Sequence, residues 1–163
     1  MKRFLPQGFM VFAGVLGIAA AAVHSDQDVT KNRKRFDLRE VILRKFLKEK
    51  HCPDQAYTES FIAEADAHGL DWRLLPSLAL VETGGGRNLK GNNLFGWANG
   101  KQTFTSIGEA IHTVASALSH GKAYRGKDLG GKLAAYNQGT DYTAMVLDIM
   151  RQISPRTAAE STD

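Results

Sequence analysis

Residues 69–86 read GLDWRLLPSLALVETGGG, and this stretch decides much of the expected fold. Its apolar residues follow the spacing of an α-helix, so we expect a helix from residue 72 to about residue 82. Asp71 stands where a helix N-cap is favoured, and Gly84 opens a run of three glycines that ends the helix. The stretch therefore predicts a short buried helix followed by a sharp turn.

Glu82 continues the apolar stripe of this predicted helix. The stripe consists of Leu75, Leu78 and Ala79. A carboxylate on a core-facing stripe is costly unless it is paired or protonated, and the C-terminus of a helix also disfavours negative charge. Both effects raise the expected pKa of Glu82, which suits a general acid that works near neutral pH. A structural ion pair of Glu82 with Arg73 or Arg87 is the alternative.

Further helices and one irregular segment are expected around this element. Helical periodicity predicts helices over residues 37–50, 54–68, 106–119, 128–135 and 141–153. Ser106 and Glu109 form a capping-box pattern at the start of the third of these. Residues 87–105 lack helical periodicity, so they predict loops with a short hairpin at Asn99-Gly100. The fold class is therefore mainly α, with a small irregular or β-hairpin lobe.

The helix over residues 37–50 is expected to be amphipathic and to pack as a structural element against the rest of the domain. The residues at helical spacing are Leu38, Val41, Ile42, Lys45 and Phe46. Asp141 is expected to cap the last helix, and Pro155 ends it.

The first 25 residues predict an export segment. Lys2 and Arg3 precede an uncharged run over residues 4–23, which ends in small residues, as in a secretory signal peptide. An uncleaved anchor in the inner membrane is the alternative, because about 20 apolar residues can span a bilayer. In either case we expect the body of the protein to lie outside the cytoplasm, in the periplasm or beyond the cell.

Four regions follow from these patterns. Residues 1–25 are a signal peptide or N-terminal membrane anchor, and residues 26–52 are a polar linker and an amphipathic helix. Residues 53–155 are the expected catalytic domain, and residues 156–163 are a polar, flexible tail.

Charge and cysteine content narrow the classes of function. The net charge of +4 favours an anionic partner, such as cell wall, membrane surface or nucleic acid. Nucleic acid is disfavoured because the basic cluster at residues 31–35 has no nucleic-acid-binding motif beside it. Cys52 is the single cysteine, and the histidines show no HExxH spacing. We therefore predict no disulfide, no metal site and no organic cofactor, and expect Cys52 to be a buried thiol.

The irregular segment combines amides with aromatic side chains, which suits a sugar-binding wall. Amides bond hydroxyl and acetamido groups, and aromatic faces cover the apolar side of a pyranose ring. The side chains concerned are Asn92, Asn93, Phe95, Trp97 and Phe104. For Phe104 we expect core packing instead.

Three motifs together resemble a known superfamily. GLDWRLLP with Val81-Glu82-Thr83 resembles the helix and catalytic motif of the soluble lytic transglycosylases. GNNLFGW at residues 91–97 resembles a segment of bacterial endo-β-N-acetylglucosaminidases of the same lysozyme-like superfamily. AYNQG at residues 135–139, with Tyr142 after it, resembles the later Ala-Tyr-Asn-x-Gly motif. The three occur in the family's order and span about residues 53–153.

The resemblance implies a lysozyme-like helical fold with a saccharide cleft and assigns a role to each site residue. Glu82 would be the catalytic acid/base. Substrate-binding roles would fall to Thr83, Asn93, Phe95, Trp97, Tyr136 and Asn137. Thr83 replaces the family's usual serine and keeps the hydroxyl, and for Trp97 inward packing is the alternative.

The number of carboxylates bears on the mechanism. Most glycosidases need two, yet residues 83–108 contain no Asp or Glu. This absence favours a lytic transglycosylase, which cleaves peptidoglycan between N-acetylmuramic acid and N-acetylglucosamine and leaves 1,6-anhydromuramic ends. A hydrolytic endo-β-N-acetylglucosaminidase and a non-catalytic wall-binding assembly factor remain alternatives. The expected partner is the glycan strand, and a partner in the inner membrane or a secretion machine stays open.

Overall fold

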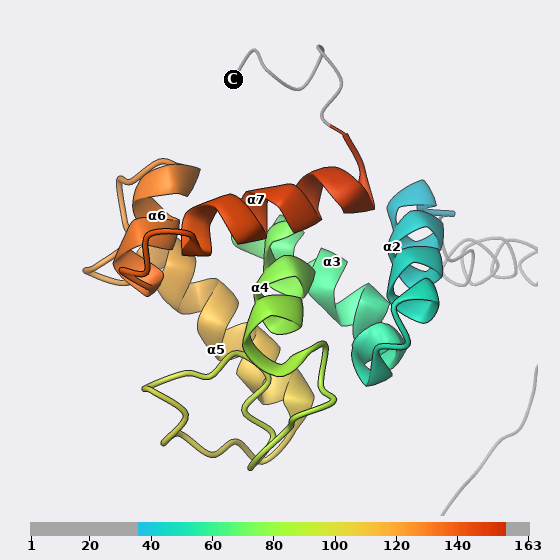
Figure 1. Cartoon of the computed structure of the whole chain (residues 1–163), viewed down its shortest axis with the longest axis horizontal. Coiled ribbons are helices and arrows are strands. Elements are labelled where there is room, and N and C mark those ends of the chain that lie inside the picture. Colours follow the sequence, from blue (N-terminus) through green and yellow to red (C-terminus); the bar gives the residue numbers. More distant parts are fainter. Residues whose placement is uncertain (1–35, 156–163) are drawn as a thin grey trace, which may run out of the picture. The chain divides into compact units, whose positions relative to one another are not determined.

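The computed structural model describes residues 36–155. Within them, the helices follow one another in the order shown in Figure 1. They are α2 (Leu38–Glu49), the 3₁₀ helix η2 (Pro53–Tyr57), α3 (Thr58–Ala67), α4 (Leu74–Thr83), α5 (Ile107–His120), α6 (Leu129–Tyr136) and α7 (Tyr142–Ile153). The mainly α class expected from the sequence is confirmed.

Helix α4 lies in the middle of the other helices, and α7 crosses it (Figure 1). The predicted stripe of Leu75, Leu78 and Ala79 is fully buried, as expected. Gly84 ends α4 with a left-handed conformation (φ 64°), which glycine adopts without steric cost. The end of α4 is thereby fixed where the irregular segment begins.

Helix α2 forms where it was predicted, but the predicted face is wrong in part. Its buried side chains are Leu43, Phe46 and Leu47, whereas Leu38 and Val41 are 59% and 49% exposed. The reason is that α2 packs against η2, α3 and α7, and these neighbours cover a face shifted around the helix. Helix α2 therefore belongs to the same compact unit as the other described helices.

Side chains cap the N-termini of α5 and α6, and the cap of α5 follows the predicted capping-box pattern. The Ser106 hydroxyl accepts a 3.1 Å hydrogen bond from the Glu109 amide, and the Glu109 carboxylate accepts one from the Thr105 amide. The Asp128 carboxylate accepts a bond from the Gly131 amide at the start of α6. Asp141 precedes α7 but makes no side-chain cap, contrary to expectation.

The segment between α4 and α5 consists of turns and bends, and no strand occurs in it or elsewhere in the described residues. Ala98, Asn99 and Gly100 have positive φ angles, so a turn forms at Asn99-Gly100 without flanking strands. The lobe is thus irregular, and the hairpin prediction is wrong. Phe104 is 8% exposed and packs in the core, as expected.

The expected export segment and the expected tail lie outside the described residues. No helix between residues 36 and 155 has the length and apolarity that crossing a membrane requires. Cys52 is a free thiol with 1% exposure, which confirms the expectation of a buried residue.

Candidate active site

Glu82 lies in the last turn of α4, partly exposed beside the start of α7. The hydroxyl of Tyr142 donates a 2.7 Å hydrogen bond to its Oε1. Burial raises the pKa of the Glu82 carboxyl, and the Tyr142 hydrogen bond lowers it in part. The net shift is upward, which is the direction expected for a general acid.

Arg73 and Arg87, the two arginines considered as ion-pair partners of Glu82, bond to other groups. The Arg73 guanidinium donates to Asp71 and to the Ser154 carbonyl. Arg87 donates to the carbonyl of Lys50. The Glu82 carboxylate is bonded instead by the hydroxyl of Tyr142, which orients it.

Gly96 brings the backbone of the irregular segment against Glu82. A Cβ at this position would lie 2.7 Å from Glu82 Oε2, closer than non-bonded contact allows, and its φ of 59° also disfavours other residues. The second carboxylate oxygen is therefore covered by backbone on one side, and only glycine permits this approach.

Two tyrosines at the junction of α6 and α7 form the opposite side of the site. The rings of Tyr136 and Tyr142 stack, with centres 6.0 Å apart and planes 11° apart. The Tyr136 hydroxyl donates a 2.6 Å bond to the Phe95 carbonyl, which ties α6 to the irregular segment. Burial and the nearby Glu82 charge raise the pKa of Tyr136, so its hydroxyl stays protonated and remains a donor at neutral pH.

A cleft of about 560 Å³ opens in front of the Glu82 carboxylate. Its wall is aromatic: the Trp97 ring centre lies 5.8 Å from that of Tyr136 and 6.4 Å from that of Tyr124. The lining residues are Glu82, Gly96, Trp97, Ala98, Asn99, Gly100, Tyr124, Tyr136 and Asn137. The structure therefore brings Glu82, Trp97, Tyr136 and Asn137 together, as the resemblance implied.

Three other residues for which the sequence predicted ligand contacts lie behind the cleft wall. Phe95 is fully buried in the core. The Asn93 amide accepts a bond from the Trp97 amide N–H and donates to the carbonyls of Trp97 and Gln102. The Thr83 hydroxyl lies 2.9 Å from the Leu94 carbonyl and accepts a bond from the Gly86 amide. Their contacts support the wall that carries Trp97 and Gly96.

Among the described residues that line the cleft, Glu82 is the one carboxylate. The other acids considered from the sequence have local roles or lie at helix starts: Glu109 and Asp128 cap α5 and α6. A site with one partly buried carboxyl and aromatic walls can transfer a proton to a bound ligand and take it back, and it can bind ring-shaped polar ligands.

The sequence did not indicate several lining residues, above all Tyr124. It also did not indicate the hydrogen bond from Tyr142 to Glu82. Tyr142 was noted only as part of the last motif. It lies 60 residues from Glu82 in the chain, and no spacing rule connects residues that far apart. The sequence also showed no sign of a group formed by Glu64, His68 and His112, which lies between α3 and α5.

No model of a known protein family matches the sequence, and no curated protein matches it.

Proposed function

We propose that this chain cleaves the glycan strands of peptidoglycan as a lytic transglycosylase of the lysozyme-like superfamily, with Glu82 as acid/base. The observation that carries the proposal is the single, partly buried carboxyl of Glu82, held by Tyr142 in a cleft with aromatic walls. The choice of peptidoglycan as the substrate rests on the three sequence motifs that resemble this superfamily. In the proposal the enzyme works outside the cytoplasm, on the cell wall.

Glu82 serves first as an acid. Burial raises the pKa of Glu82, which favours the protonated form that gives a proton to the glycosidic oxygen as the C1–O bond of N-acetylmuramic acid breaks. The acetamido oxygen of the same sugar stabilises the cationic carbon. This substrate group takes the place of the second carboxylate that most glycosidases use.

Glu82 then serves as a base. As a carboxylate it removes the proton from the 6-hydroxyl of the muramic acid ring, and O6 bonds to C1. The product carries a 1,6-anhydro ring, water is not consumed, and Glu82 regains the proton with which it began. The Tyr142 hydrogen bond stabilises the carboxylate formed between the two steps.

The cleft supports the binding part of the proposal. Trp97 and Tyr124 line the cleft, and such aromatic rings can cover the apolar side of a sugar, while the amide of the lining residue Asn137 can make polar contacts. Asn137 Oδ1 already accepts a bond from the Gly139 amide, which fixes its orientation.

Hydrolysis is the second candidate, and the resemblance of residues 91–97 to glucosaminidases favours it. In that case Glu82 activates a water molecule instead of the 6-hydroxyl. A wall-binding factor that keeps the cleft without cleaving is the third.

The proposal is tested by incubating the full-length chain with purified peptidoglycan and measuring soluble glycan fragments. Glu82→Gln removes the proton that must be transferred but keeps the size of the side chain, so it should abolish fragment release. Glu49→Gln is a matched control, because Glu49 is an exposed glutamate at the end of α2, outside the cleft. A fully active Glu82→Gln protein would contradict the proposal, and binding without fragments from the wild type would favour the wall-binding factor.

A further inference from the structure

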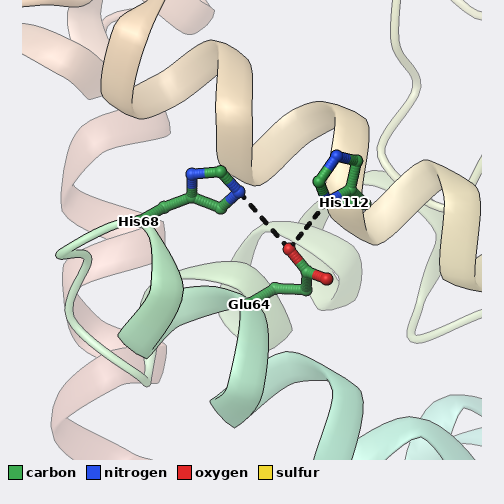
Figure 2. A group of neighbouring side chains, drawn as sticks. All are labelled: Glu64, His68 and His112. Atoms are coloured by element: carbon green, nitrogen blue, oxygen red, sulfur yellow. Dashed lines mark hydrogen bonds and ion pairs between the residues drawn. The ribbon is translucent and has the colours of Figure 1, made fainter.

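A cluster of one carboxylate and two imidazoles joins α3 to α5 and shares no residue with the cleft. Glu64 lies on α3, His68 follows its last turn, and His112 lies on α5. Figure 2 shows both imidazole rings pointing toward the Glu64 carboxylate. One ligand atom from each residue lies within 4.8 Å of the other two.

Both histidines approach the same carboxylate oxygen. His112 Nδ1 is 2.9 Å and His68 Nε2 is 3.4 Å from Glu64 Oε2. Ligand atoms around a tetrahedral Zn²⁺ lie about 3.3 Å apart, because each is about 2.0–2.1 Å from the metal. The ring centres of His68 and His112 are 5.6 Å apart. Two imidazoles on one tetrahedral ion have ring centres about 5 Å apart by the same geometry, so small side-chain movements suffice to admit a metal.

His68 is held in place but lacks good partners for its ring. Both ring nitrogens are buried, and neither makes a hydrogen bond within the described residues. Its backbone is fixed: the amide caps α3, and the carbonyl accepts a 2.8 Å bond from the Ser119 hydroxyl on α5. A buried polar ring without a hydrogen bond is unfavourable, and a bound cation would give one of its nitrogens a partner.

The three side chains of the cluster differ in their exposure to solvent. The side chains of His68, Glu64 and His112 are 12%, 27% and 62% exposed, so the cluster opens to solvent on the His112 side. An ion can enter from that side, and water can complete its coordination.

We propose that Glu64, His68 and His112 bind a divalent transition metal ion, for which Zn²⁺ is the best match. Two imidazoles and one carboxylate form a donor set that Zn²⁺ uses in proteins, with the fourth position left to water. The carboxylate supplies the negative charge that offsets the dication. The ion joins α3 to α5, so binding stabilises the folded chain.

The test is a titration of the metal-free full-length chain, made without a polyhistidine tag, with Zn²⁺ followed by calorimetry. The expected result is saturable binding of one ion per chain. Tm should rise by about 5 °C or more when free Zn²⁺ is about a hundredfold above Kd. Co²⁺ in place of Zn²⁺ should give the visible absorption of a four-coordinate ion, which reports the site directly.

Two variants and one control locate the ion. His112→Ala and Glu64→Gln each remove a ligand and should weaken binding at least about tenfold. His112 is exposed, so its replacement leaves the fold intact, and circular dichroism checks this. His51→Asn is the matched control: it removes an exposed histidine outside the cluster, and asparagine tolerates the positive φ of 54° at that position.

Two outcomes overturn the proposal. One is the absence of saturable Zn²⁺ binding to the wild type. The other is binding that His112→Ala and Glu64→Gln leave unchanged, because the ion would then be held elsewhere in the chain.

Discussion

The hydroxyl of Tyr142 donates a 2.7 Å hydrogen bond to Oε1 of Glu82, across 60 residues of sequence. The first residue of α7 thereby orients the carboxylate at the end of α4. The bond also stabilises the ionised form of a carboxyl whose pKa burial raises. A group that must give a proton and then take one back needs both influences.

Tyr142→Phe should shift the alkaline limb of the profile of kcat/KM against pH to higher pH. The hydrogen bond lowers the pKa of Glu82, so its removal leaves burial unopposed and the pKa rises. Protonated Glu82 is the active form at the start of the reaction, and activity is lost as pH rises through this pKa. The limb in kcat/KM against pH should therefore lie at higher pH in the variant. An unmoved limb would mean that another group controls it.

Gly96→Ala should reduce activity far more than its loss in free energy of unfolding explains. The added Cβ would lie 2.7 Å from Glu82 Oε2 and force the carboxylate to move. A displacement of about 1 Å in a reacting group can cost about a hundredfold in rate, and the positive φ costs about 1–2 kcal/mol of stability. Gly126→Ala is the matched control, because Gly126 has a φ of 74° and an added Cβ there would meet no atom of the described residues within 4 Å. It should lose similar stability in denaturant unfolding but keep its activity.

Asn93→Ala distinguishes a role of Asn93 in supporting the cleft wall from direct binding of the ligand. The Asn93 amide makes three hydrogen bonds that hold Trp97 and Gln102, and it is 4% exposed. Loss of these bonds should lower the free energy of unfolding by about 2–4 kcal/mol and raise KM through a looser Trp97 wall. If the free energy of unfolding does not change while KM rises, the side chain acts on the ligand directly, as the resemblance implied.

Asp54 should make stability depend on pH. Burial raises its pKa from 3.8 to about 7, against the opposing effects of a hydrogen bond from its own backbone amide and of the Arg87 charge. Between these values the folded chain keeps a proton that the unfolded chain releases, so stability falls as pH rises through this window. The loss amounts to about 4 kcal/mol at about 1.36 kcal/mol per pH unit.

Asp54→Asn supplies the check on that assignment. The amide has the size of the carboxyl but does not titrate, so the decline in unfolding free energy between pH 3.8 and about 7 should become much smaller. Burial and the Asp54 charge raise the pKa of the neighbouring Cys52 thiol from 9.0, so Cys52 does not titrate in this window. An equally steep decline in the variant would assign it to other groups.

The sequence predicted the end and the buried stripe of α4 well, because its apolar stripe is strong and its end carries glycines. The predicted start was wrong: α4 begins at Leu74 with Arg73 at the N-cap position, and Asp71 does not cap it. The sequence also predicted α2 but not the face of α2, since apolar side chains occur around much of that helix and its neighbours decide which are covered. Leu43 and Leu47 are buried, whereas Leu38 and Val41 stay exposed. Local patterns fix where helices form, and long-range packing fixes how they are oriented.

The site residues that could be predicted are those that belong to one of the three sequence motifs. Glu82, Trp97, Tyr136 and Asn137 were expected and line one cleft. Tyr124 belongs to no motif, and the role of Tyr142 depends on a long-range contact. The Glu64–His68 pair has helical spacing, but His112 completes the cluster from another helix, 48 residues after Glu64. Such clusters become visible only once helix packing is known.

Cleavage by Glu82 without water is distinguished from hydrolysis by the masses of the released fragments. Full-length chain and Glu82→Gln are incubated with purified peptidoglycan, and the soluble products are analysed by mass spectrometry. If this mechanism operates, the wild type alone releases fragments one water lighter than hydrolysis products, with anhydromuramic ends. Fragments with reducing ends, or the same fragments from Glu82→Gln, would contradict it.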